Sequence, residues 1–486
     1  MQRKVSKHAT TDLTQGRHFA TIAKFALPFM LSDFLQQLYN AVDSIIIGQN
    51  LGSVALAGIG VATPIMSIVM NFLMGLAMGT GVILSQYFGR GDYATLKRVL
   101  TTGMIAGGVF TVVMSAICVG LSEYFLIWLG TPQEAVPPAD SYLKIIFAGG
   151  IFTFLYNYYM FSMRAVGNSV APLVFLGAGV ILNAFLDVIL VVYTPLGIRG
   201  AAIATIAAQA LSVVMCAVYV KKRVEILHIR RKEWVFDRKL FSACMTYGLT
   251  VGLQQVVVYA GRLAVQGLVN TYGTDVMAGV NNATRLDALM QTPWRGYTNA
   301  LTNYYAQNWG AGKKMRIQLG FKDSLWLAAV NAAVFLLVGI FLSTPLSRAF
   351  VGDGDTQVVV DVGARFLEIT TYGYVFVGII LLSQAFFKGV GMMKCFFLTT
   401  VSSIAGRVAF SYLFDSFWGI EGMYWAVPAS WVLASAVGIV FIIYTYFRRI
   451  RKMPANPFKN PTCYNAGLII SKKDKVEVSV SGDYYA

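Results

Sequence analysis

Long apolar segments are the feature that most constrains how this chain can fold. We identify about twelve, each about twenty residues long, which is the length that crosses a hydrocarbon core of roughly 30 Å. They begin near residues 24, 54, 99, 141, 170, 199, 241, 276, 322, 362, 394 and 420. A bilayer offers the backbone no hydrogen-bond partners, so each spanning segment is expected to be helical. With 56% hydrophobic and 13% charged residues among 486, the chain is predicted to be an all-α membrane protein with twelve transmembrane helices.

Basic residues are distributed unevenly among the predicted loops. Alternate loops carry nearly all of the lysines and arginines, among them Arg90, Arg164, Lys313 and the tail from Arg448, and the loops between them carry mostly acids. By the positive-inside rule, we expect a multi-pass protein of the cell membrane with both termini in the cytoplasm. The net charge of +16 is then explained by topology and by contact with membrane lipid, and nucleic acid is not expected as a partner.

The sequence carries no motif of a catalytic, cofactor or zinc site. Its five cysteines form no CxxC pair, and its three histidines lie in basic segments. We find no phosphate-binding glycine loop and no nucleophile elbow. Residues 1 to 20 are polar and do not resemble a cleaved signal peptide. We therefore expect neither an enzyme nor a bound cofactor, and no metal apart from a coupling ion.

The two halves of the sequence match each other. A shift of about 221 residues places LGSVALAG over YGTDVMAG and SQYFGRG over AQNWGAG, and with small gaps LGIRG meets WGIEG. Each half holds an even number of predicted helices, so both halves have the same orientation in the membrane. Parallel duplications of this kind are typical of secondary transporters, whose substrate cavity lies between the halves. A duplicated scaffold or receptor is the alternative.

The duplication divides the chain into five parts. They are a cytoplasmic N-terminus (1–23), an N-lobe of helices one to six (24–220), a basic cytoplasmic linker (221–240), a C-lobe of helices seven to twelve (241–447) and a cytoplasmic tail (448–486). The tail is mostly polar, and we expect it to be disordered.

Polar residues form one stripe on the first predicted helix. At about 100° per residue, five side chains fall within roughly a third of its circumference. They are Asp33, Gln36, Gln37, Asn40 and Asp43. A central acid costs about 2.5 to 3.5 kcal/mol on the insertion scale, so the stripe must face protein or water. Asp43 is then either a functional carboxylate or a structural one capped by a neighbouring helix, and Asp33 is expected to line a wet vestibule.

A second acid lies in the fifth predicted helix. Asn183 and Asp187 are spaced i, i+4, which puts an amide and a carboxylate on one helix face, and Thr205 follows on the next helix. Such oxygen atoms could bind a hard cation. They could also share a proton, because burial and a neighbouring like charge both favour the protonated form of a carboxylate. We therefore interpret the first half of the chain as the lobe that would bind a coupling cation.

The second half carries stripes of a different charge, on the seventh and eighth predicted helices. The residues are Gln255, Tyr259, Arg262 and Gln266 on one helix, and Asn281, Arg285, Thr292, Arg295 and Asn299 on the next. No acid stands where the duplication would place Asp43, and Arg407 falls opposite Asn183. We interpret this half as a binding or gating wall. The alternative is that its arginines are internal ion-pair partners, with Asp287 as the local acid.

At these residues the sequence resembles the multidrug and toxic compound extrusion (MATE) family. The resemblance extends from about residue 20 to residue 447. It is carried by LPFMLSDFLQQLYNAVDSIIIGQNLGSVALAGIG, SQYFGRGD, MRAVGNSVAPL, ILNAFLDVILV and PLGIRGAAIATIAAQ. Within that family, the sequence resembles the DinF-like branch.

The resemblance implies an exporter with two six-helix lobes around a central cavity, and we expect it to act as a monomer. It would exchange organic compounds, cationic or zwitterionic, for H⁺ or Na⁺. In that branch the coupling roles would fall on Asp43, Asn183, Asp187 and Thr205, and Pro28 matches a first-helix proline at which the helix bends. The candidate substrate-cavity residues are Gln37, Asn40, Gln255, Tyr259, Arg262, Arg285 and Arg295.

Two positions depart from the family pattern. Gln255 stands where other branches carry an acid in the C-lobe, and Asp33 lies in a motif that more often has a neutral residue there. An arginine-lined wall would suit anionic or zwitterionic compounds as well as cations. A flippase for a lipid-linked or anionic substrate is therefore one alternative, and a non-transporting membrane receptor or scaffold is another.

Overall fold

The computed structural model describes residues 10–50, 52–349 and 357–451, without the side chains of 40–45, 47–49, 52–57 and 59. In these ranges the chain forms helices and no strand, which confirms the all-α prediction. The first half contains α1 (His18–Asn50), α2 (Gly52–Arg90), α3 (Tyr93–Trp128), α4 (Val136–Ala148), α5 (Gly150–Ala165), α6 (Val170–Asp187), η1 (Val188–Val192) and α7 (Ile198–Arg223).

The second half repeats this order. It contains α8 (Arg238–Val269), η4 (Asn270–Tyr272), α9 (Thr274–Gly310), α10 (Lys314–Ala349), α11 (Gln357–Thr371), α12 (Tyr374–Gly389), α13 (Met393–Trp418), α14 (Ile420–Thr445) and η5 (Tyr446–Ile450). Two short 3₁₀ turns, η2 (Glu225–Leu227) and η3 (Arg231–Glu233), lie between the halves.

The helices agree with the predicted number of spans. Eight helices in the described ranges are long and apolar enough to cross a membrane. Two bent pairs pass the same test together, α4 with α5 at 46° and α11 with α12 at 60°. The remaining long helices are α1, with 33 residues, and α9, with 37, and both carry the polar stripes. With each bent pair counted as one rod, the described ranges hold six rods in each half.

Glycines with positive φ lie at the ends or beginnings of equivalent helices in both halves. This backbone region is open to glycine and strained for most other residues. The glycines pair as Gly91 with Gly312, Gly167 with Gly391 and Gly197 with Gly419, with φ between 51° and 82°. Because these pairs follow the alignment of the sequence halves, the duplication extends to the turns between helices.

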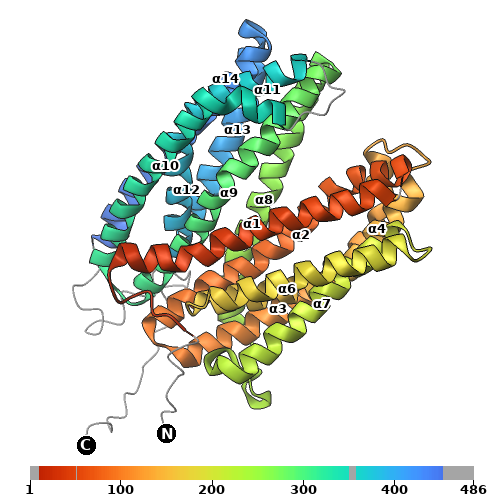
Figure 1. Ribbon diagram of the computed structural model, residues 1–486. Coiled ribbons are helices and arrows are strands. Elements are labelled where there is room, and N and C mark those ends of the chain that lie inside the picture. The colour runs from red at the N-terminus through yellow and green to blue at the C-terminus, as the bar shows by residue number, and fades with distance from the viewer. Residues whose placement is uncertain (1–9, 51, 350–356, 452–486) are drawn as a thin grey trace, which may run out of the picture.

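The two halves form two lobes that meet at one end and diverge towards the other (Figure 1). The N-lobe comprises α1 to α7 and the C-lobe α8 to α14. We call the end at which they meet the convergent end. Where α2 and α9 finish there, a Cβ added to Gly89 would lie 2.0 Å from the carbonyl oxygen of Gln307, and one added to Gly310 would lie 1.8 Å from that of Gln86. Gln86 and Gln307 are equivalent in the duplication, so this contact is self-complementary across an approximate two-fold axis.

Further from that end, two pairs of glycines hold α2 against α8. A Cβ on Gly75 would lie 2.6 Å from the backbone nitrogen of Gly252, and one on Gly79 would lie 2.4 Å from that of Gly248. On each helix the two glycines are four residues apart, and small residues at this spacing let membrane helices approach closely. The two backbones therefore touch where the lobes meet.

The segment before α1 is bound to the opposite lobe at the convergent end. Leu13 is fully buried, and its N–H donates to Gln307 Oε1 at 3.0 Å. The Leu13 carbonyl accepts from Asn308 at 3.2 Å and from Arg316 at 3.1 Å. Arg316 also donates to the carbonyls of Gln15 and Gly16. A segment that continues into the N-lobe is thus held by α9 and α10 of the C-lobe.

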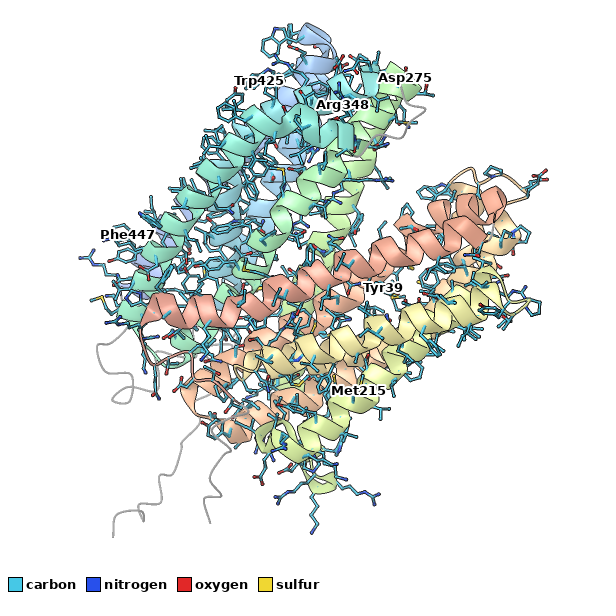
Figure 2. The ribbon with its side chains drawn as sticks, viewed as in Figure 1. Tyr39, Met215, Asp275, Arg348, Trp425 and Phe447 are labelled. Atoms are coloured by element: carbon cyan, nitrogen blue, oxygen red, sulfur yellow. The ribbon has the colours of Figure 1, made fainter. Side chains whose placement is uncertain are left out.

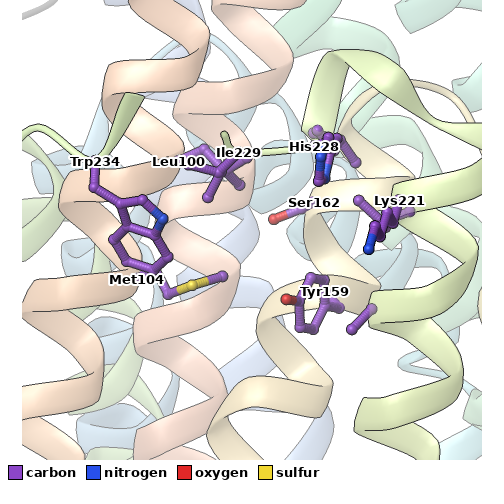
Figure 3. A pocket seen from close by; sticks show the side chains of 11 residues that line it. Leu100, Met104, Tyr159, Ser162, Lys221, His228, Ile229 and Trp234 are labelled. Atoms are coloured by element: carbon purple, nitrogen blue, oxygen red, sulfur yellow. The ribbon is translucent and has the colours of Figure 1, made fainter. Parts of the chain in front are cut away.

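The linker between the lobes is held against the N-lobe. Lys97 Nζ on α3 lies 2.7 Å from Glu233 Oε1. Burial opposes ionisation of the Glu233 carboxyl, but the Arg230 backbone N–H and the Lys97 ammonium outweigh it and lower the pKa of that carboxyl. Between the linker and the N-lobe helices lies a cavity of about 230 Å³, and Ser162 and Trp234 are among the residues that line it (Figure 3).

Candidate functional site

Three of the predicted coupling residues come together inside the N-lobe. Asn183 and Asp187 on α6 are 2% and 0% exposed. With its amide oriented to satisfy both neighbours, Asn183 donates to Asp187 Oδ2 at 2.9 Å and accepts from the backbone N–H of Thr205 on α7 at 3.2 Å. The i, i+4 spacing on α6 and the contact with α7 thus produce one hydrogen-bonded group.

The first helix reaches this group through a residue that sequence reasoning missed. The Tyr39 hydroxyl on α1 lies 3.3 Å from Thr205 Oγ1, on the side of α1 that faces α6 and α7 (Figure 2). Position 43 follows Tyr39 by one helical turn, so the backbone of α1 brings it past the same group. The side chains of Asp43 and Asn40 lie outside the described residues.

The helix changes its form directly after Asp187. Residues Val188–Val192 form a π-helical turn, η1, and then the chain turns back into α7. A Cβ on Gly200 of α7 would lie 2.5 Å from the Leu190 carbonyl oxygen, so α7 packs tightly against this turn. Single π-helical turns are frequent at functional sites. No feature of the sequence indicated this one.

In the C-lobe, neutral donors satisfy the carboxylate of Asp287 on α9. Asp287 accepts hydrogen bonds from the Tyr374 hydroxyl at 2.5 Å and from Gln291 Nε2 at 2.8 Å. Arg295 and Arg407 interact with it only through longer-range electrostatics. The ion pairs found within the described ranges include none of the C-lobe cavity arginines. The interpretation of these arginines as ion-pair partners is therefore not supported.

The arginines of this wall instead present their guanidinium groups to open space or to rings. Arg262, Arg285 and Arg295 are exposed, and the Arg262 guanidinium lies 5.7 Å from the centre of the Tyr259 ring. The Nε of Arg407 has no hydrogen-bond partner among the described residues. An arginine at membrane depth must face water or a partner of opposite charge. This wall therefore carries an excess of positive charge.

Two predicted cavity residues contact the other lobe. The Asn71 amide on α2 donates to the Tyr259 hydroxyl at 3.2 Å, and Gln255 on α8 reaches Asn71 Oδ1 at 3.5 Å. Gln37, on α1, is half-buried. Sequence reasoning missed Asn71, although a lone amide within an apolar helix is a usable signal.

Asp33 lies between cations from both lobes. It interacts electrostatically with Arg164 of the N-lobe and Arg295 of the C-lobe. Arg164 is 4% exposed, and its guanidinium lies 4.1 Å from the centre of the Phe29 ring. Pro28 is a buried residue within α1, and its carbonyl accepts from Ser32 Oγ at 2.7 Å. Asp33 is partly buried on α1, so the expectation that it lines a wet vestibule stays a prediction.

The N-lobe group offers oxygen atoms to a cation. Asp187 supplies a carboxylate, Thr205 and Tyr39 supply hydroxyls, and Asn183 supplies an amide oxygen if the amide turns over. Carboxylate, hydroxyl and carbonyl oxygens are the ligands that hard cations prefer. Within the described residues, no three His, Cys, Asp or Glu side chains are close enough to hold a transition metal.

Comparison with known proteins shows the family. A model of the MatE family matches residues 28–189 and, a second time, residues 251–413. The chain therefore belongs to the MatE family, and each lobe carries one copy of the family's repeat.

Relatives match along nearly the whole chain. The probable multidrug resistance protein YpnP of Bacillus subtilis is 29% identical over 446 residues, which is 90% of this chain and 97% of YpnP. The multidrug export protein MepA of Staphylococcus aureus is 21% identical over 430 residues, covering 87% of this chain and 94% of MepA.

Solved structures share the fold. A MOP superfamily transporter from Pyrococcus furiosus, for which a reverse polarity of the binding pocket was taken to suggest a different function, superposes with a TM-score of 0.86 at 21% identity, covering 93% of this chain and all of that one. An outward-facing multidrug resistance MATE transporter gives a TM-score of 0.85 at 21% identity, covering 93% of this chain and 99% of that one.

Proposed function

We propose that this protein is a secondary active multidrug exporter that releases organic compounds in exchange for inward-moving H⁺ or Na⁺. The observation that carries the proposal is the hydrogen-bonded group of Asn183, Asp187 and Thr205, buried in the N-lobe and joined to α1 through Tyr39. An acid held this way inside a membrane protein is typical of an ion pathway. The chain is a transporter of the MatE family and not an enzyme.

The Asn183 amide gives this group two arrangements. When its NH₂ faces Asp187, it donates to an ionised carboxylate. A proton on Asp187 would need an acceptor, and a Na⁺ ion beside it would need an oxygen ligand. Either ion therefore favours turning the amide oxygen towards Asp187. In our proposal the ion-free arrangement is the one in which the amide NH₂ faces Asp187.

Ion entry would then act on the first helix. Asp43, assigned by resemblance to the DinF-like branch, and Asp187 are neutralised together, α1 bends near Pro28, and the space between the lobes loses affinity for the drug. The membrane potential supplies about 2.3 kcal/mol per charge per 100 mV, roughly a fortyfold concentration gradient. Coupling requires ion and drug to favour different conformations, since a ligand with equal affinity for both shifts nothing.

The positive charge of the C-lobe wall indicates which charge the substrate carries. Arg262, Arg285 and Arg295 are exposed there, while the carboxylate of Asp287 is occupied by Tyr374 and Gln291. Guanidinium groups bind carboxylates, sulfonates and phosphates. We therefore favour substrates that carry an anionic group, such as zwitterions, over purely cationic compounds.

The proposed setting is the cell membrane, with both termini in the cytoplasm and the protein acting as a monomer. The described chain begins and ends at the convergent end, where Leu13 contacts Gln307 and the Arg451 carbonyl accepts from Lys314. With that end in the cytoplasm, the lobes diverge towards the outside, which corresponds to an outward-open conformation.

Transport by purified protein in liposomes tests the proposal. A zwitterionic fluoroquinolone and the cation ethidium are each offered under an imposed pH gradient and, separately, an imposed Na⁺ gradient. We expect one gradient to drive movement of the zwitterion, with ethidium moved more slowly. Absence of gradient-driven transport of either compound would contradict the assignment.

A flippase is the second candidate, and the arginine wall is the observation that favours it. A lipid-linked pyrophosphate would satisfy several guanidinium groups at once. In that case, fluorescent lipid pyrophosphate would cross the liposome bilayer faster with the protein than without it, and neither drug would be moved.

A further inference from the structure

The cavity between the linker and the N-lobe has a volume of about 230 Å³, and its lining includes no residue of the coupling group or of the arginine wall. Its walls come from α3, α5 and α7 and from the linker. One water takes a share of about 30 Å³ in the liquid, so the space is large enough for a small molecule. This cavity is therefore a candidate binding site separate from the space between the lobes.

Two contacts hold the linker in place beside the cavity. Lys97 of α3 pairs with Glu233. The hydroxyl of Thr101, one turn further along α3, donates to the Val235 carbonyl at 2.8 Å. Trp234 lies between these two anchored linker residues and contributes to the lining. Because α3 fixes the backbone on either side of the Trp234 ring, the cavity does not depend on a ligand to form.

The most buried polar group of the lining has no partner. Ser162 on α5 is 2% exposed, and its hydroxyl makes no hydrogen bond with any described residue. The Tyr159 hydroxyl, one turn earlier on α5, also lines the cavity, and Figure 3 shows both oxygen atoms directed towards the side on which Trp234 lies. A buried hydroxyl without a hydrogen bond is unfavourable, so the site favours an occupant that bonds to Ser162.

The charge of the lining favours an anion. Lys221 at the end of α7 and His228 in the linker both line the cavity, and neither takes part in an ion pair within the described ranges. The described lining contains no acid. The linker acids Glu225 and Glu233 each pair with another cation. A carboxylate in the cavity would therefore meet the Lys221 ammonium without competition from these acids.

The rest of the lining is apolar and suits a ring. Leu100 and Met104 of α3 lie on one side, and Ile229 of the linker and the Trp234 ring complete it. Thioethers and aromatic rings both make favourable contacts with an aromatic ring. A few polar groups within an apolar lining are typical of sites that bind small molecules. The lining thus suits a compound with an aromatic ring and one anionic group.

The equivalent place in the C-lobe is occupied by side chains. In the duplication α5 matches α12, so Ser162 corresponds to Phe386. In the same way α3 matches α10, so Leu100 corresponds to Phe321. The centres of the two phenylalanine rings lie 5.8 Å apart, and Phe386 is 4% exposed. Aromatic rings therefore pack where the N-lobe has a serine and a cavity, and the cavity is a feature of the N-lobe and not of the repeat.

We propose that this cavity binds a small aromatic carboxylate. Lys221 pairs with the carboxylate, and Ser162 donates a hydrogen bond to one of its oxygen atoms. The ring lies against Trp234 and Met104. The bound compound would join the linker to α3, α5 and α7. Because the site shares no residue with the coupling group or the arginine wall, it does not rest on the transport reaction proposed above.

Binding of para-nitrobenzoate to the full-length protein in detergent tests the proposal, with neutral para-nitrobenzamide as the comparison compound. Calorimetry measures affinity, and quenching of tryptophan fluorescence that is lost in Trp234→Phe locates the compound. We expect the carboxylate to bind saturably and the amide to bind much more weakly. Lys221→Gln and Ser162→Ala should each weaken binding about tenfold, the loss expected for a hydrogen bond to a charged group. Ser162→Phe, which introduces the residue of the C-lobe, should abolish binding.

The matched control is Lys222→Gln, which removes an exposed cation of α7 that does not line the cavity. It should leave binding unchanged. Lys221 is also exposed, so its variant tests the proposal even where Ser162→Phe fails to fold. Equal weakening by the control, equal affinity for the two compounds, or full quenching in Trp234→Phe would overturn the proposal. Absence of saturable binding would overturn it too, because water alone would then fill the cavity.

Discussion

At the scale of single residues, the Asn183 amide can satisfy Asp187 in two ways, and the occupant of the carboxylate decides between them. An ionised Asp187 accepts from the amide NH₂, the orientation that satisfies both neighbours of Asn183. A protonated or Na⁺-bound Asp187 needs the amide oxygen instead. We therefore propose that this residue pair senses ion binding, and the contact between Thr205 and Tyr39 connects it to α1.

Removing the charge of either predicted coupling acid should abolish ion-driven transport. We expect Asp187→Asn and Asp43→Asn each to lower gradient-driven export at least tenfold, because neither side chain can then bind or release the ion. Export from proteoliposomes measures this. The control is Asp361→Asn, an exposed acid of α11. Full export by either coupling variant would contradict the assignment of that acid.

The contact between Tyr39 and Thr205 should transmit ion binding to the first helix. Tyr39→Phe and Thr205→Val each remove one hydroxyl of a pair 3.3 Å apart. We expect each to raise the ion concentration for half-maximal transport severalfold. The double variant should be no worse than the poorer single one, since the two act through one interaction. Additive effects would show that the hydroxyls act independently.

Much of this residue group follows from the sequence. The spacing of Asn183 and Asp187 predicts that they share a helix face, whereas their contact with Thr205 depends on how α7 packs against α6 and could not be predicted. Tyr39 was missed because an aromatic residue in an apolar helix gives no signal of its polar contact. The link from Asp287 to Tyr374 was missed because it joins residues 87 positions apart.

At the scale of helices, the contact between α2 and α8 depends on the absence of side chains. We expect Gly79→Ala to destabilise the protein by about 1 to 3 kcal/mol or more, because the new Cβ would lie 2.4 Å from the Gly248 backbone. Thermal unfolding in detergent measures this. In Gly108→Ala on α3 the Cβ meets nothing within 4 Å, so stability should be unchanged or slightly higher. An equal loss of stability in the two variants would contradict the conclusion that α2 and α8 are in backbone contact.

The segment before α1 should hold the convergent end closed. Arg316→Ala removes donors to the carbonyls of Leu13, Gln15 and Gly16. We expect a cysteine introduced as Thr14→Cys, 6% exposed, to react with a water-soluble maleimide severalfold faster in this variant. Arg98→Ala, which removes an exposed cation of α3, should leave the rate unchanged. An unaltered rate in Arg316→Ala would exclude this role for the segment.

The helices themselves could largely be predicted, and their contacts could not. Apolar length identified the spans, and the match between the halves paired equivalent helices such as α2 and α9. The bends in α4–α5 and α11–α12, which fall at Gly149 and Gly373, and the π-helical turn after Asp187 were not predicted. A periodic pattern along one helix does not contain that information.

At the scale of the whole molecule, two lobes of different charge meet at a nearly symmetric interface. The contacts of Gly89 with Gln307 and of Gly310 with Gln86 are equivalent across the interface. The sites on either side are not equivalent, since the N-lobe buries Asp187 while the C-lobe exposes Arg262, Arg285 and Arg295. We infer that the ion and the drug bind to different lobes and that the interface between the lobes couples the two sites.

The central claim is that ion binding at Asp187 in the N-lobe lowers the affinity for the drug, and drug binding to purified protein tests it most directly. Affinity for the transported drug is measured while pH and, separately, Na⁺ concentration are varied, for wild type and for Asp187→Asn. We predict that one of the two ions lowers the affinity of the wild type at least tenfold and leaves that of Asp187→Asn unchanged. A wild-type affinity independent of both ions, or an equal dependence in the variant, would contradict the account.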